Sequence, residues 1–244
     1  MRLAVSAALA AIALVLGLRR ALGAAWLSDD SFISFRYADH LVRGHGLVYN
    51  VGERVEGYTN LLWTLLLAGA LRLGIPPEVS AAVLGIAAWL VLVGILGWRS
   101  RRRDRPGLFF PLAAALVLLL EDFQVWATGG LETSLFTLLV TAGLLLASRP
   151  GARPRQLMLA GVLLVAAVAT RPDGVIFAAV AVAGAWVVND AMYPRERLAL
   201  TAALAVPLAL GGAALAAFKL AYYGDLFPTA FYSKSALDPF YTQG

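Results

Sequence analysis

Long apolar runs, separated by short polar connections, make up most of this chain. A helix crosses the roughly 30 Å hydrocarbon core of a membrane when about 20 consecutive residues are apolar. The pattern therefore predicts an all-α polytopic membrane protein with about seven spans, several of which are short. These spans cover residues 4–26, 80–98, 108–120, 131–147, 157–170, 175–189 and 198–222.

One further apolar segment, residues 61–75, is too short to be treated in the same way. At about 1.5 Å per residue, a helix of this length reaches about 22 Å, which is less than the hydrocarbon thickness. We predict that it lies along the membrane surface as an interfacial or re-entrant helix. This choice decides the side of the membrane on which every later connection lies.

The distribution of arginine supports that choice. If residues 61–75 do not cross, eleven of the twenty Lys and Arg residues and only three of the fifteen acids fall on one face. The positive-inside rule makes this face cytoplasmic. The opposite, external face then receives residues 28–60, 121–126, 132, 171–173 and 222–244.

Composition agrees with the membrane class, because 60% of the residues are hydrophobic and only 14% are charged. The basic pI of about 9.8 arises largely from the arginine-rich connections, so it gives no reason to expect a nucleic-acid partner. The chain has no cysteine, which excludes disulfides, thiolate metal sites and cysteine nucleophiles. It also has no phosphate-cradling Gly-rich loop, nucleophilic serine motif or zinc-binding pattern.

Most of the polar chemistry lies in the external segment 28–60, which begins with the adjacent carboxylates of Asp29 and Asp30. Neighbouring residues do not face the same way, so the two carboxylates are expected to divide their roles. The alternative is that they cap the following helix. Arg171 and Asp173 are open to two interpretations as well: they are either part of a site or a local ion pair around Pro172.

Two sets of short blocks in the chain carry a resemblance to known proteins. The most specific blocks are residues 29–38 (DDSFISFRYA), 44–50 (GHGLVYN) and 53–60 (ERVEGYTN). Weaker blocks follow at residues 126–133 (WATGGLET), 170–174 (TRPDG), 222–228 (YYGDLFP) and 232–234 (YSK). These blocks resemble bacterial GT-C glycosyltransferases, a superfamily of membrane enzymes that use polyprenyl-phosphate sugars. The likeness is closest to the arabinofuranosyltransferases that use decaprenyl-phosphate arabinose, and protein mannosyltransferases are more distant.

The resemblance implies a GT-C-like transmembrane bundle in which residues 28–77 form an external loop with juxtamembrane helices. Because such enzymes are usually longer, residues 1–244 are expected to be the amino-terminal part of a larger protein. The implied reaction is inverting transfer of a sugar from a polyprenyl phosphate to a glycan or other hydroxyl acceptor. It would take place on the external face of a bacterial plasma membrane.

Site residues follow from the same resemblance. Asp29 occupies the first acidic position of the motif and is expected to be the general base, while Asp30 orients the acceptor or a metal. A divalent cation such as Mg, Mn or Ca is a further possibility; its oxygen ligands besides Asp30 would be Glu53, Glu56, Glu121, Asp122 and Glu132. The expected substrate-binding residues are Arg36, Tyr58, Trp126, Glu132, Arg171, Asp173, Tyr232 and Lys234.

Two other classes of function stay open at this point. A transporter or flippase would use the external acids to relay protons or to bind a cation. Transporters, however, commonly place ionisable groups near the bilayer midplane and consist of repeated halves. The predicted spans are almost free of central charge and no internal repeat is visible. The other alternative is a non-catalytic lipid-binding or assembly subunit that keeps the same fold.

Overall fold

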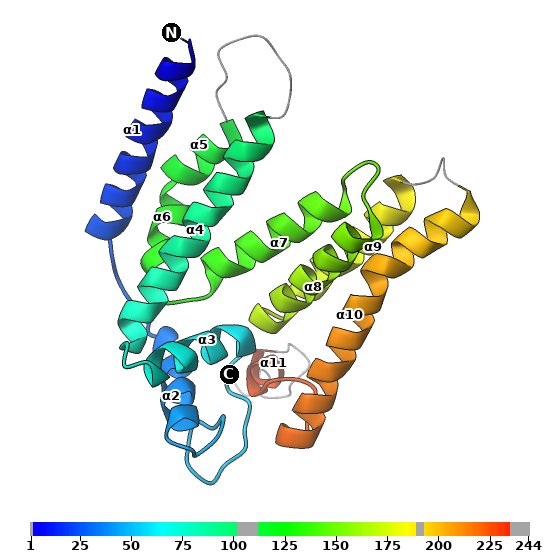
Figure 1. The fold of residues 1–244 in the computed structure, drawn as a ribbon. Coiled ribbons are helices and arrows are strands. Elements are labelled where there is room, and N and C mark those ends of the chain that lie inside the picture. The colour runs from blue at the N-terminus through cyan, green and yellow to red at the C-terminus, as the bar shows by residue number, and fades with distance from the viewer. Residues whose placement is uncertain (1, 102–111, 189–192, 235–244) are drawn as a thin grey trace, which may run out of the picture.

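The computed structural model describes residues 2–101, 112–188 and 193–234; the side chains of residues 2–7, 101, 233 and 234 are not among those described. Within these ranges the chain is all-α, as predicted. Figure 1 shows a bundle of helices with α2, α3 and α11 gathered at its lower end. The other helices form two groups that meet where α4 packs against α7.

The first group of helices contains α1 (Arg2–Gly23), α4 (Pro77–Arg101), α5 (Leu112–Leu119) and α6 (Glu121–Thr128). Small residues let these helices approach closely. A Cβ atom added to Gly17 of α1 would lie 2.7 Å from the carbonyl oxygen of Leu118, so a larger residue does not fit there. Close packing through small residues is the usual mode of helix association in membranes.

The second group contains α7 (Thr133–Ala147), α8 (Pro154–Thr170), α9 (Gly174–Val188) and α10 (Pro194–Tyr223). Its core combines Leu157, Leu164 and Leu204 with several alanines. A Cβ on Gly161 of α8 would lie 2.6 Å from the carbonyl oxygen of Leu204, so α8 and α10 are in close backbone contact. The connections at the lower ends of these helices are thereby held in fixed positions.

The helices follow the predicted apolar runs. For the run 108–120, only its part within the described residues can be compared, and α5 lies there. Among the described residues, two helices, Pro77–Ser100 and Pro194–Tyr223, are long and apolar enough to cross a membrane; α6 and α7, bent by 118°, would add a third if counted as one span. The chain is therefore an all-α membrane protein, as predicted, and the number of spans stays a prediction.

Three short helices lie together at the end of the bundle. They are α2 (Ser31–Val42), α3 (Leu61–Arg72) and α11 (Thr229–Lys234). Helix α3 has 12 residues, and it runs across the lower end in Figure 1. It packs on α2 through Trp63 and Leu67, which contact Phe35 and Ala38. That residues 61–75 do not cross the membrane stays a prediction.

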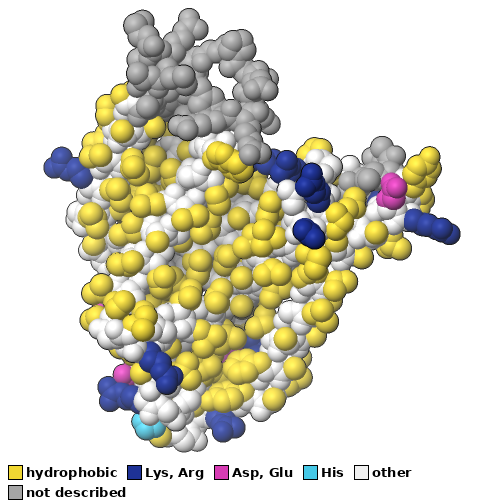
Figure 2. Space-filling view, viewed as in Figure 1, with side chains coloured by type: hydrophobic (Ala, Val, Ile, Leu, Met, Phe, Trp, Pro, Cys, Tyr) yellow, Lys and Arg dark blue, Asp and Glu magenta, His cyan; other side chains and the backbone are white. Residues whose placement is uncertain are grey.

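Charged side chains gather at the two ends of the molecule. Figure 2 shows hydrophobic side chains over most of one face, with Lys and Arg mainly near its upper and lower ends. The connection between α7 and α8, which contains Arg149 and Arg153, and the start of α10 lie at the upper end in Figure 1. The predicted arginine-rich face is therefore the end opposite α2, α3 and α11.

Candidate functional site

A cavity of about 520 Å³ opens at the end of the bundle where the short helices lie. Its volume falls within the roughly 300–1,000 Å³ typical of small-ligand sites. The wall is built from the start of α2, the segment before α3, the α6–α7 and α8–α9 connections, and α11. The lining residues are Asp30, Ile33, Ser34, Gly57, Tyr58, Thr59, Asn60, Leu131, Glu132, Arg171, Pro172, Asp173 and Ala230. Segments far apart in the sequence thus meet at one site, as predicted.

Arg171 carries the positive charge of the cavity wall. It ends α8 in an extended conformation and donates its backbone N–H to Ala167 at 2.8 Å. Its Nε lies 3.2 Å from Asp173 Oδ1 and its Nη1 lies 3.8 Å from Glu132 Oε1. The guanidinium also lies 5.4 Å from the ring centre of Phe136. Because 39% of the side chain is still exposed, it can bind an anion while held on several sides.

The two residues form a local ion pair across Pro172, as one of the two interpretations expects. Both also line the cavity, and their role in a substrate site stays a prediction. Arg171 is the only cation among the described lining residues, and its guanidinium lies near the carboxylates of Glu132 and Asp173.

Glu132 is buried behind Arg171, with 7% of its surface exposed. Asn60 donates its side-chain amide to Glu132 Oε2 at 2.7 Å. The Asn60 side-chain oxygen accepts hydrogen bonds from Ser34 Oγ at 3.1 Å and from Thr64 Oγ1 at 3.2 Å. These contacts connect α2, the start of α3 and the α6–α7 connection within the cavity wall.

The two adjacent carboxylates have different surroundings. Asp30 lines the cavity, whereas Asp29 is not among the lining residues. One oxygen of Asp29 accepts the backbone N–H of Asp30 at 2.9 Å and faces Ser28 Oγ at 3.4 Å. Asp30 occupies the N-cap position of α2, but its side chain makes no capping hydrogen bond. The position of Asp30 is thus the one that the capping alternative expects, but its exposed side chain lines the cavity and makes no capping hydrogen bond.

Four of the eight predicted substrate-binding residues line the cavity, and four are not among its lining residues. Arg36 donates Nε to the carbonyl of Tyr49 at 2.7 Å and lies over that residue's ring. Trp126 packs edge-on against Trp26 and lines a second, smaller hollow of about 100 Å³. Tyr232 donates its hydroxyl to Asp225, and the side chain of Lys234 lies outside the described residues.

Tyr58 is the predicted aromatic that does reach the wall. Its surface is only 3% exposed, and its ring centre lies 4.4 Å from that of Tyr37. Its hydroxyl lies 3.1 Å from the hydroxyl of Tyr223 on α10. Burial raises the pKa of Tyr58 well above its usual range, so the phenol stays protonated and acts as a hydrogen-bonding group.

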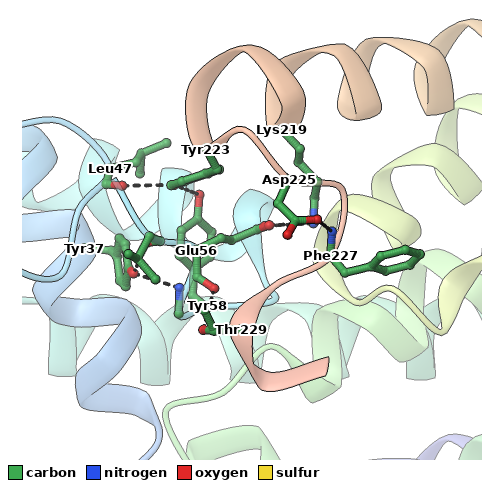
Figure 3. A network of polar contacts seen from close by, with 11 residues as sticks. Tyr37, Leu47, Glu56, Tyr58, Lys219, Tyr223, Asp225, Phe227 and Thr229 are labelled. Carbon is green, nitrogen blue, oxygen red and sulfur yellow. Dashed lines mark hydrogen bonds and ion pairs between the residues drawn. The ribbon is translucent and has the colours of Figure 1, made fainter. Parts of the chain in front are cut away.

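Glu56 joins the segment before α3 to both α10 and α11 (Figure 3). Its carboxylate lies 2.8 Å from Lys219 Nζ of α10. Its backbone carbonyl accepts both the N–H and the hydroxyl of Thr229, each at 3.0 Å, at the start of α11. Gly57, next in the chain, donates its N–H to the hydroxyl of Tyr37 at 2.8 Å. One wall of the cavity is thus fastened to the C-terminal helices.

Replacing Lys219 by Met should destabilise the protein by about 3 kcal/mol, because it leaves the buried Glu56 carboxylate without its ion-pair partner. The measurement is the thermal unfolding midpoint in detergent. Burial raises the pKa of Glu56 even though Lys219 opposes the shift. Without Lys219 this pKa should rise further, so the folded state holds the Glu56 proton more tightly than the unfolded state. The stability of the variant should therefore fall as pH rises above the normal glutamate range.

The double variant Glu56→Gln with Lys219→Met is the matched control, because no carboxylate is left to titrate. Its unfolding midpoint should vary with pH less than that of Lys219→Met alone. Equal pH dependence of the two variants would show that Glu56 is not the group responsible.

Of the acids expected as metal ligands, Glu132 lines the cavity together with Asp30, whereas Glu53 and Glu56 have other partners. Glu56 pairs with Lys219, and Glu53 accepts the side-chain amide of Asn50 at 3.1 Å. Among the described residues, no group of three or more His, Asp and Glu side chains lies close enough to hold a metal ion. The prediction of a divalent cation therefore gains no support from these side chains.

Sequence reasoning did not single out Asn60 or Lys219. Lys219 is the only charged residue between Arg197 and Asp225, in an otherwise apolar run, and this isolation was the available signal. Asn60 directly precedes an apolar run, which is a common position for a helix cap, but its contact with Glu132 spans 72 residues. No local pattern indicates a partner that distant.

Comparison with known proteins identifies relatives of this chain. No family model and no solved structure matches it. It is 29% identical over 237 residues to a terminal β-(1→2)-arabinofuranosyltransferase of Mycobacterium tuberculosis, covering 90% of this chain and 36% of that protein. It is 28% identical over 257 residues to a protein of the same name from Corynebacterium glutamicum, covering 90% of this chain and 34% of that protein. The chain spans about a third of the length of these curated relatives. It is thus related to the arabinofuranosyltransferases, as the motif blocks predicted.

Proposed function

We propose that this protein transfers a sugar from a polyprenyl phosphate to a hydroxyl acceptor at the external face of the membrane. Arabinofuranose is the first candidate sugar, because both relatives are named for its transfer. The observation that carries the proposal is the cavity in which Asp30, Glu132, Arg171 and Asp173 meet. A carboxylate and a guanidinium on one wall are the groups that acid–base transfer from a phosphate requires.

The proposed orientation places the cavity outside the cytoplasm and the long helices across the membrane as multiple spans. The α7–α8 connection with Arg149 and Arg153 and the start of α10 with Arg195 and Arg197 lie at the opposite end of the bundle, and the positive-inside rule assigns that end to the cytoplasm. A polyprenyl phosphate keeps its chain in the bilayer and its headgroup at the surface. A cavity at the end of the helices suits such a donor.

In the proposed reaction the acceptor oxygen attacks the anomeric carbon of the donor from the face opposite the phosphate. The bond between this carbon and the phosphate oxygen breaks, and the phosphate leaves with the bonding electrons. A carboxylate takes the acceptor proton, so the products are an inverted glycoside and a prenyl phosphate. Arg171 stabilises the negative charge that develops on the leaving phosphate.

Asp30 is our choice for the base, because its carboxylate lines the cavity. Asp29, which the motif position favours, accepts a hydrogen bond from the backbone N–H of Asp30, and its proposed role is to position Asp30. The two assignments predict different effects of single substitutions.

The transport alternative receives less support from the distribution of charge. Helices α7 and α9 contain no charged residue, and α8 has only Arg155, in its first turn. Ionisable groups of a transport pathway are expected near the midplane. The charges that line the cavity lie instead in connections at the helix ends.

The proposed topology predicts that cysteines placed at Val51 and Leu73 are both labelled from outside intact cells by an impermeant thiol reagent. These side chains are 62% and 81% exposed, and the natural chain has no cysteine to interfere. A cysteine at Arg149 should be labelled only after the cells are opened. Labelling of positions 51 and 73 from opposite sides would contradict the placement of α3.

Donor selectivity tests the proposed sugar. Polyprenyl phosphates carrying arabinofuranose, ribofuranose or mannose should be compared as donors in nanodiscs that contain the full-length protein. We expect the highest kcat/KM with arabinofuranose. A higher kcat/KM for mannose would keep the transferase class and reject this sugar.

A further inference from the structure

Asn60 is a buried residue of the cavity lining, and both the oxygen and the nitrogen of its side-chain amide have a partner. It is 6% exposed and directly precedes α3. Its oxygen accepts hydrogen bonds from Ser34 and Thr64, which fixes the orientation of the amide. The nitrogen is therefore directed to Glu132, at 2.7 Å.

Glu132 uses its two oxygens for different partners. Oε2 accepts the Asn60 amide, and Oε1 faces Arg171 Nη1 at 3.8 Å. Because Glu132 is buried, its charge has to be balanced by these neighbours. Asn60 thus fixes the orientation of the Glu132 carboxylate relative to the Arg171 guanidinium.

We infer that Asn60 is a positioning residue for the phosphate of the donor. It fixes Glu132, and through Glu132 it holds the Arg171 guanidinium at the cavity wall. This inference rests on the proposed function, in which Arg171 binds the phosphate. Arg171 is the only cation among the described lining residues, and it is then already oriented before the donor binds. Donor binding therefore does not have to order this side chain.

The contacts at position 60 require a side chain that has both a hydrogen-bond donor and a hydrogen-bond acceptor and that has the length of asparagine. An Asp at this position would place a second carboxylate against Glu132 at hydrogen-bond distance, and two like charges so close cannot both be ionised easily. A Leu would leave the Ser34 hydroxyl, the Thr64 hydroxyl and Glu132 without their partner. Asn60→Asp is therefore the sharper test, because it keeps the shape and changes only one group.

The experiment measures inhibition of the full-length protein in nanodiscs by a prenyl monophosphate that carries no sugar. Asn60→Asp should raise its Ki about tenfold, the size expected for a lost charge-assisted interaction. The donor KM should rise with it, and kcat should change less. In an Arg171→Gln background, Asn60→Asp should change the Ki little further, because its effect acts through Arg171.

A swapped variant separates positioning from folding. Asn60→Asp combined with Glu132→Gln restores an amide–carboxylate hydrogen bond, so the thermal unfolding midpoint should recover. The Ki should stay raised, because the residue that faces Arg171 no longer carries a charge. As a matched control, Gln124→Glu makes the same kind of change at a buried amide of α6 outside the cavity, and the Ki should stay as in the natural protein.

Two results would overturn the inference. Full recovery of the Ki in the swapped variant, or additive effects of Asn60→Asp and Arg171→Gln, would show that Asn60 does not act through the charge facing Arg171. If Arg171→Gln raises the Ki and Asn60→Asp does not, only the role of Asn60 is rejected. If Arg171→Gln itself has no effect, the proposed phosphate site is rejected together with this inference.

Discussion

Replacing Asp30 by Asn should lower the rate of sugar transfer by about 10²- to 10⁴-fold, the usual contribution of a general base. Donor binding should change by less than a few fold, because the amide has nearly the same shape and the base acts on the acceptor. The effect should therefore appear in kcat and not in the Ki of a sugar-free prenyl phosphate. Transfer kinetics and inhibitor binding are measured on variants expressed and folded to equal extent.

Asp39→Asn is the matched control for this substitution. Asp39 lies on the same helix, pairs with Arg43 at 2.8 Å and is not among the residues that line the cavity. Asp29→Asn decides between the two carboxylates. If Asp29→Asn is inactive and Asp30→Asn turns over normally, the base is the residue that the motif position favours.

Arg171→Ala should weaken donor binding and slow transfer at the same time. A guanidinium that contacts the phosphate stabilises both the bound donor and the charge that develops as the phosphate leaves. We expect a rise of about 10- to 100-fold in the Ki of a prenyl phosphate, as for a lost hydrogen bond to a charged group. The fall in kcat should be additional to this weaker binding of the phosphate.

Arg43→Ala removes an exposed arginine of similar charge that lies away from the cavity, and it should leave both quantities unchanged. A kcat that falls in Arg171→Ala with an unaltered Ki would confine Arg171 to the chemical step. An unaltered kcat and Ki in Arg171→Ala would show that Arg171 has no role in the proposed site.

The fold was largely predictable because membrane helices are visible in a sequence as long apolar runs. The placement of residues 61–75 followed from length and arginine distribution, and α3 indeed lies across the end of the bundle. The bend between α6 and α7 was not predicted. Gly130, in the connection between these two helices, adopts a positive φ of 82°, and no apolar pattern encodes that conformation.

The site was predictable to the extent that it depends on topology. Once the side of each connection is known, Glu132, Arg171 and Asp173 must come to one end of the helices. The partners of Arg36, Trp126 and Tyr232 were not predictable, because each side chain found a neighbour in its own surroundings: Tyr49, Trp26 and Asp225 respectively. An exposed cation or aromatic ring in a loop has many possible partners, and sequence alone does not rank them.

The pair of Glu56 and Lys219 illustrates the same limit over a longer distance. Its members are 163 residues apart, so their meeting depends on how α10 packs against the rest of the bundle. Burial of two opposite charges together is favourable only when their geometry is fixed by such packing.

Turnover of synthetic polyprenyl-phosphate arabinofuranose by the full-length protein in nanodiscs tests the central claim most directly. We expect release of the prenyl phosphate coupled to formation of an inverted arabinofuranoside on a glycan acceptor. We also expect that turnover disappears when Asp29 and Asp30 are both replaced by Asn. Wild-type-like turnover by that double variant would contradict the assignment of the chemistry to this cavity.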